Sequence, residues 1–492
     1  RIDIKELGYG PEPYALADAS MFVDDLHAVE MEGMSVRLVG LDREIIEGLW
    51  ARRENGVHSG GAARPATVDS AGGTAGNTNG NTHVNTQGNA QGSTDDGAVE
   101  ALYSDPDLIP VSRRDDGRPV YDRRHVEAFA TGRPSRAFGV RYRRFDRGRM
   151  ARLPADPFSF VDRIVPEAGA PWILEKGAVA RAEYDVPEDA WYFDASRLDS
   201  MPYSVLLEAA LQPCGWLAAW LGSALAADEP LFFRNLEGEA IQRAMVPRDA
   251  GTIVTEARLE SVSRAGSMIL QEFRFVTSGA AGTILEGVTR FGFFPEAALA
   301  QQAGIKVSED LWVRPAAAGK GFPILATPPL LPGDPAEPHA GLALPAGAFR
   351  LLDRVDALHL AGGAKGLGFA AGSKKVRPDD WFFAAHFRGD PVMPGSLGLE
   401  ALLQLLQHWA RERWPGLVST HRFACMPPPR PHVWTYRGQV LPGAGRVEVL
   451  ASITEVRDGA APLVVADGLL LADGKPIYEM KDFALALVPE GS

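Results

Sequence analysis

The second half of this chain repeats the first at a nearly constant spacing of 191 to 192 residues. Met201-Pro202 aligns with Met393-Pro394, and residues 207–212 (LEAALQ) align with residues 399–404 (LEALLQ). A repeat of this length is a whole structural unit, and two related units in one chain generally pack against each other. The sequence therefore predicts two copies of one fold.

Each copy contains a helix that is apolar on nearly every face. The pattern from Ser396 onward places leucine or alanine on all sides of the helix, which is typical of a helix enclosed by a core. Pro394 and Gly395 mark its start, and Ser396 is the expected N-cap. Residues 203–226 form the counterpart, and we interpret them as a buried core helix because Glu208 and Pro213 interrupt the run.

Strand-like runs follow each helix. One long helix followed by several antiparallel strands predicts an α+β unit, with a sheet packed on the helix. The expected strands are residues 253–263, 267–277 and 283–294 in the first copy, and 433–440, 447–456, 463–471 and 475–488 in the second.

The second copy carries a set of residues suited to acid–base chemistry. His386 follows an aromatic run at 381–383 and precedes the Gly/Pro-rich turn 389–395 (GDPVMPG). Glu400 lies in the second turn of the helix, where a buried carboxylate is costly unless it is paired or used. The helix start at Gly395 offers free backbone N–H groups that can hold a negative oxygen. These parts can together remove water from a 3-hydroxyacyl thioester.

Residues 386–401 resemble the active-site segment of the FabA-type hotdog dehydratases of fatty acid synthesis. The resemblance implies a double hotdog, in which two antiparallel sheets each wrap around a central helix. It also implies a site shared between the units, with the histidine from one and the acid from the other. His386 would then be the base and Glu208 the acid, with Glu400 as the alternative acid.

The same resemblance implies roles for the residues around this pair. Gly395 and Ser396 would polarise the thioester carbonyl at the helix N-terminus. Gln212 and Gln404, one turn beyond each acid, would orient the acids. The expected walls of the substrate tunnel are Phe387, Pro391, Val392, Met393 and Pro394.

The first copy departs from this pattern. Asp194 stands at the position of His386, and residues 198–200 (LDS) replace residues 389–391 (GDP). The alignment therefore predicts one working site for each pair of units, with Glu400 facing Asp194. Two alternatives remain open at this point: the same fold with added trans-2/cis-3 isomerase activity, and a non-catalytic scaffold that binds acyl chains or carrier proteins.

Residues 120–490 as a whole resemble the dehydratase regions of bacterial polyunsaturated fatty acid synthases and related polyketide megasynthases. The resemblance implies a substrate held on the phosphopantetheine of an acyl carrier protein, and contact with the other domains of a synthase. It implies no cofactor and no metal bound by this chain, and leaves open a homodimer formed through the parent synthase. Because the chain begins at Arg1 rather than Met, we expect it to be part of a longer protein.

Charge and cysteine content limit the expected partners and the cell compartment. The formal net charge of −13 argues against nucleic acid or an anionic membrane as the main partner. Cys214 and Cys425 favour reduced structural thiols in a cytoplasmic protein. An arginine-dense run at 141–152 predicts a solvated strand or loop, with docking of an acidic carrier protein as the alternative. The expected segments are a small αβ tail (1–54), a disordered linker (55–100), a lead-in (101–152), the first unit (153–313), a second linker (314–347) and the second unit (348–490).

Overall fold

The computed structural model describes residues 2–8, 14–23, 26–37, 107–307, 322–323 and 341–491. Its contacts divide the chain into two units, residues 1–91 and 92–492, and each is described by itself.

The first of these units contains an antiparallel sheet of three strands. They are β1 (Ile2–Gly8), β2 (Tyr14–Val23) and β3 (Leu26–Arg37), with β2 in the centre. Within the αβ tail the sequence predicts a strand at 34–41, and β3 covers residues 34–37 of it. The helix expected at 42–50 and the linker expected at 55–100 lie outside the described residues.

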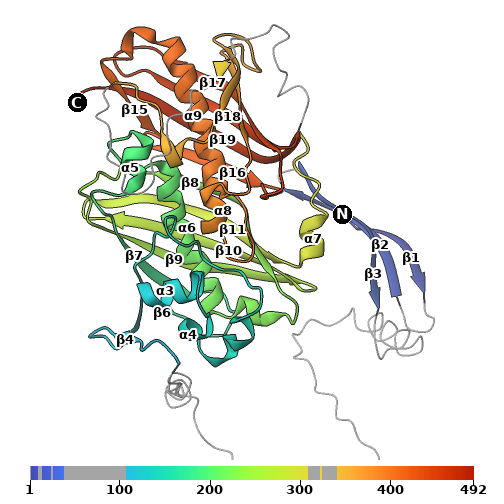
Figure 1. The fold of residues 1–492 in the computed structure, drawn as a ribbon. Coiled ribbons are helices and arrows are strands. Elements are labelled where there is room, and N and C mark those ends of the chain that lie inside the picture. Colours follow the sequence, from blue (N-terminus) through green and yellow to red (C-terminus); the bar gives the residue numbers. More distant parts are fainter. Residues whose placement is uncertain are drawn as a thin grey trace, which may run out of the picture. The chain divides into compact units, whose positions relative to one another are not determined.

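Two long helices lie at the centre of the other unit. These helices, α6 (Tyr203–Trp220) and α9 (Gly395–Arg413), pack against each other. Both lie on one face of a 16-stranded sheet (Figure 1). Nearly every residue of α6 is buried, and so is α9 from Ser396 to Gln407, as their apolar sequences require.

The sheet repeats its strand order on the two sides of its middle. The order β14-β17-β18-β19-β16 in the second repeat mirrors β7-β9-β10-β11-β8 in the first, which confirms the predicted double hotdog. The first repeat contributes β6 (Arg163–Ala168), β7 (Val179–Asp185), β8 (Phe232–Gln242), β9 (Thr252–Ala265), β10 (Met268–Gly279) and β11 (Gly282–Phe294). The second contributes β13 (Arg354–His359), β14 (Phe369–Lys375), β15 (His421–Cys425), β16 (Arg430–Tyr436), β17 (Arg446–Arg457), β18 (Leu463–Ala472) and β19 (Lys475–Pro489).

The two repeats join through β8 and β16, which pair antiparallel. Gly238 lies opposite Trp434 in this ladder, and a Cβ atom at Gly238 would lie 2.2 Å from the Trp434 ring. The indole N–H of Trp434 donates to the side chain of Asn235 at 2.9 Å. The pairing makes one continuous sheet of both repeats, and one hydrophobic core runs through them.

The two central helices begin at a proline. Pro202 and Pro394 are the N-cap residues, and neither helix has a side-chain cap. The expected N-cap role of Ser396 was therefore wrong. Ser396 lies inside the first turn of α9, and its hydroxyl is directed to the first repeat instead.

The lead-in folds against the first repeat. It contains α3 (Arg123–Ala130), whose N-cap is Asp122, then α4 (Ser135–Phe138) and the 3-10 helix η1 (Val140–Phe145). The arginine run at 141–152 was expected to be a strand or loop. This was wrong for its first residues, 141–145, which belong to the 3-10 helix η1. Tyr142 and Phe145 of η1 are buried in the core of the first repeat, and this burial holds the turn.

The second repeat also begins earlier than expected. Leu342 and Ala346, assigned to the second linker, are buried, and the Ala346 N–H donates to the carbonyl of Ala195 at 2.8 Å. Residues 322–323 form the short strand β12 against β13. Residues 314–321 and 324–340 of that linker lie outside the described residues.

Candidate active site

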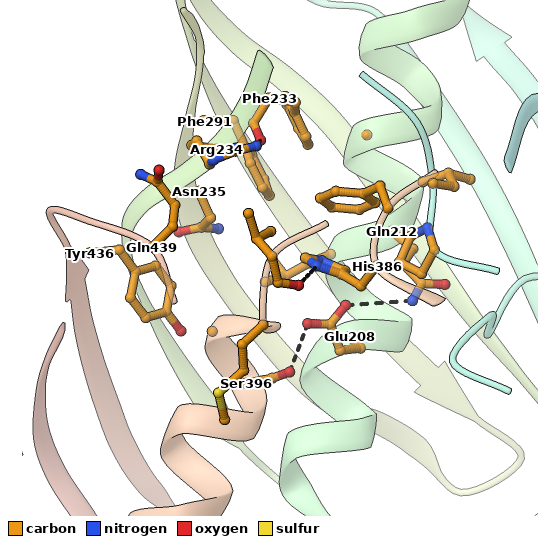
Figure 2. Close-up of a pocket in the computed structure, with 18 of the residues that line it drawn as sticks. Glu208, Gln212, Phe233, Arg234, Asn235, Phe291, His386, Ser396, Tyr436 and Gln439 are labelled. Atoms are coloured by element: carbon orange, nitrogen blue, oxygen red, sulfur yellow. Dashed lines mark hydrogen bonds between the residues drawn. The ribbon is translucent and has the colours of Figure 1, made fainter. Parts of the chain in front are cut away.

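A pocket of about 100 Å³ opens between the two repeats. Its walls come from α6 and β8 of the first repeat, and from the start of α9 and the segment before it in the second. His386 and Glu208 both line it, and they lie next to each other in Figure 2. The remaining lining side chains that Figure 2 labels are Gln212, Phe233, Arg234, Asn235, Phe291, Ser396, Tyr436 and Gln439.

His386 comes directly after α8 (Trp381–Ala385), which contains the aromatic run. Its Nδ1 lies 3.0 Å from the carbonyl oxygen of Val392 and donates to it. This bond fixes the tautomer and leaves Nε2 with a lone pair. Burial lowers the pKa of His386 to about 3, and the positive charge of Arg234 acts in the same direction. The imidazole is therefore neutral near pH 7 and able to accept a proton.

Glu208 belongs to the second turn of α6. Its carboxyl group accepts a hydrogen bond from the Ser396 hydroxyl at 2.7 Å and lies 3.5 Å from the Gln212 amide nitrogen (Figure 2). Burial raises the pKa of Glu208 to about 7, although both hydrogen bonds favour the charged form. The group thus holds a proton at neutral pH more readily than an exposed glutamate does.

Gln212 is itself fixed by the backbone. Its amide donates to the carbonyl of Phe158 at 2.9 Å and accepts from the N–H of Phe160 at 2.9 Å. The side chain therefore cannot rotate away from Glu208 without losing both bonds. The role of Gln212 in orienting Glu208 stays a prediction.

Glu400 has an almost identical environment in the other repeat. It accepts from Ser204 at 2.9 Å and from Gln404 at 3.2 Å, and burial raises its pKa to about 7. Gln404 is held by the backbone of Phe349 and Leu351, just as Gln212 is held in the first repeat. Glu400 does not line the pocket that contains His386.

The position equivalent to the histidine is different. Asp194 forms an ion pair with Arg248 at 2.6 Å and is about one-third exposed. The partner of Asp194 is thus the guanidinium group of Arg248, and the expectation that Asp194 faces Glu400 stays a prediction. Tyr203, buried at the start of α6, occupies the place that Gly395 has at the start of α9. A buried tyrosine therefore stands in the first repeat where the second repeat has the glycine that lines the pocket.

Gly395 lines the pocket as the first residue of α9. A Cβ atom there would lie 2.5 Å from the ring of Tyr436, so glycine permits the close approach of this strand. The N–H groups of a first helical turn have no partner within the helix and carry the positive end of its dipole. They are suited to hold an oxygen that becomes negative.

The expected tunnel walls are present in part. Phe387, Val392 and Met393 line the pocket, whereas Pro391 and Pro394 are not among its lining residues. The sequence missed the walls from elsewhere, namely Arg152, Leu153, Phe233, Arg234, Asn235, Phe291, Tyr436, Gln439 and Tyr478. They belong to strands and connecting segments with no recognisable motif, so only the fold brings them to the site.

The described residues contain no group of three His, Cys, Asp or Glu side chains arranged to hold a metal ion. Cys214 and Cys425 are both free and buried. In the part of the chain that the structure covers, none of the helices combines the length and apolar character needed to cross a bilayer.

The fold and the shared pocket define the chain as a double hotdog whose site is built from both repeats. Residues 153–281 and 344–481 match the FabA-like domain model, and the chain belongs to this family. One of the subunits of the polyunsaturated fatty acid synthase of Thraustochytrium sp. is 32% identical over 391 residues, which are 74% of this chain. The chain spans 26% of the length of that relative.

Solved hotdog structures are more distant. The dehydratase domain from the terminal module of the rifamycin polyketide synthase is 14% identical, with a TM-score of 0.35; the match covers 67% of this chain and 95% of that one. A bifunctional dehydratase-cyclase domain of ambruticin biosynthesis is 15% identical, with a TM-score of 0.33, covering 68% and 98%.

Proposed function

We propose that this chain is a dehydratase that converts (3R)-3-hydroxyacyl thioesters into trans-2-enoyl thioesters. The observation that carries the proposal is the pairing of a neutral His386 and a proton-bearing Glu208 in one pocket. A base and an acid whose pKa values have moved in opposite directions are what an elimination of water needs.

In the proposed reaction, Nε2 of His386 accepts the proton from the carbon next to the thioester carbonyl. The carbon–carbon double bond forms as the bond to the 3-hydroxyl breaks, and Glu208 donates its proton so that water leaves. The carbonyl oxygen gains negative charge during the first transfer. The N–H groups at the start of α9, beginning with Gly395, would hold that charge.

The substrate would be tethered to an acyl carrier protein through phosphopantetheine. Support comes from the similarity to part of a polyunsaturated fatty acid synthase, in which neighbouring domains would share the same carrier. The apolar side of the pocket, with Phe233 and Phe291, fits an acyl chain.

The test follows formation of the enoyl thioester by its absorbance, with a 3-hydroxyacyl-pantetheine and then a carrier-bound substrate. We expect His386→Ala and Glu208→Gln each to lose at least about 100-fold in kcat, because general acid–base groups contribute at least this much. Glu400→Gln is the matched control, since it changes the equivalent carboxyl group outside the pocket.

Activity lost in Glu400→Gln but kept in Glu208→Gln would assign the acid to the histidine's own repeat. A folded wild type that gives no enoyl product with either substrate would favour a scaffold that binds acyl chains.

A further inference from the structure

Arg234 on β8 reaches across the repeat boundary to Asp390 of the turn that follows His386. Its two terminal nitrogens lie 2.5 and 2.7 Å from the two oxygens of Asp390, in a bidentate ion pair. Both side chains are largely buried, at 9% and 13% exposure. A bidentate pair fixes direction as well as distance, and burial protects it from screening by salt.

Asp390 is part of the turn that shapes the histidine. The Phe387 N–H donates to the Asp390 carbonyl at 3.2 Å, and the Asp390 N–H donates to the Phe387 carbonyl at 3.1 Å. Two residues later, the Val392 N–H donates to the His386 carbonyl at 2.8 Å, and the Val392 carbonyl accepts from the imidazole. The position of Asp390 therefore sets the position of the Val392 carbonyl, which orients the imidazole ring of His386.

The corresponding turn of the first repeat lacks this arrangement. Asp199, which the alignment sets beside Asp390, binds Arg422 at 3.1 Å and is 64% exposed. The buried pair accompanies only the turn that contains the histidine. A role in general folding of the repeat would not explain this difference, because both repeats fold the same way.

We propose that Arg234 and Asp390 are positioning residues that hold His386 in its reactive orientation from the opposite repeat. The first repeat would then supply both the acid and the support of the base. This inference rests on the proposed dehydratase function for its kinetic readout. Asp390 is the cleaner position to change, because Arg234 lines the pocket and Asp390 does not.

The kinetic test uses the full chain and Asp390→Asn, which keeps the shape of the side chain and removes its charge. We expect kcat to fall about 10- to 100-fold with KM changed less than about twofold, since a small misplacement of a catalytic group costs rate. Arg163→Ala is the control, because Arg163 makes a bidentate pair with Asp185 on β6 and β7, away from the pocket. We expect its kcat to equal that of the wild type.

Added guanidinium ion provides a second measurement. It should restore activity to Arg234→Ala, where Asp390 remains to hold it, but not to Arg234→Ala/Asp390→Ala. Equal rescue of both variants, or an Asp390→Asn variant with full kcat, would overturn the proposal.

A third measurement does not depend on activity. In ¹⁵N-histidine-labelled protein, with the signal assigned through His386→Gln, the wild type should show one neutral tautomer protonated at Nδ1. Asp390→Asn should show exchange between tautomers. If the wild type has no dehydratase activity but this change occurs, the proposed function fails and the positioning role stands. An unchanged spectrum overturns the positioning role.

Discussion

Glu208 and Glu400 have the same kinds of hydrogen-bond partner, but the pocket beside them differs. Ser396 and Gln212 bond Glu208 as Ser204 and Gln404 bond Glu400. One difference is the residue at the start of the opposite helix, which is Gly395 beside the pocket and the buried Tyr203 in the other repeat. The chemistry of this site therefore depends on an absent side chain as much as on those present.

Ser396 gives a test of the acid. Its hydroxyl stabilises the charged form of Glu208, so it lowers the pKa that burial raises to about 7. In Ser396→Ala, we expect this pKa to rise. Because the reaction needs protonated Glu208, the fall of kcat/KM on the alkaline side should move to higher pH.

The pH profile of kcat/KM for wild type and Ser396→Ala measures this shift. Ser204→Ala serves as the control, since it makes the same change beside Glu400. If the alkaline fall of kcat/KM stays at the same pH in Ser396→Ala, or moves in Ser204→Ala, the assignment of Glu208 as the acid is contradicted.

Helix α6 is the element that shapes the pocket on the side of the first repeat. Gly215 lines both the pocket and a small apolar void bounded by Phe129 and Met150. A Cβ atom at Gly215 would lie 3.3 Å from Leu153 and 3.4 Å from Phe233. A larger side chain there would therefore separate the two spaces.

We expect Gly215→Leu to raise KM about tenfold or more for long acyl chains and to change it little for short ones. The expected size follows from the value of a few methylene groups in an apolar pocket. Kinetics with a series of 3-hydroxyacyl-pantetheine thioesters of increasing length would measure it. A uniform change for all lengths would show that the acyl chain does not pass Gly215.

The elements themselves were predictable where the sequence pattern is strong. Both central helices and seven of the later strands were found, because uniform burial and alternation leave clear patterns. Strand β14 was missed since it is buried on both faces and does not alternate. Strand β8 was missed because it mixes charged and apolar residues. Arg234, which lies on β8, was therefore not predicted as a site residue. The motif predicted His386 and the aligned helix predicted Glu208, and the structure places both in one pocket, whose other walls depend on tertiary packing.

At the scale of the whole molecule, β8 and β16 connect the repeats into one sheet. Gly238→Ala would place a methyl group against the Trp434 ring at a distance that requires strands to move. We expect a loss of about 1 to 3 kcal/mol in the free energy of unfolding, as for other overpacked cores. Thermal or denaturant unfolding measures it, with Gly416→Ala, which meets open space, as the control.

Activity should fall together with stability in Gly238→Ala, because the strand pairing also aligns Arg234 with its partner. A variant as stable as wild type would show that the Trp434 ring can move aside without cost.

The contacts across β8 and β16 also decide how this domain can be recombined. A chimaera joined between the repeats would take its acid from one parent and its base from the other. Such a hybrid needs three matches across the junction, namely Ser396 to Glu208, Asp390 to Arg234, and Trp434 to a glycine at 238. The smallest transferable cassette is therefore the pair of repeats, because one repeat alone carries only part of the walls of the shared pocket.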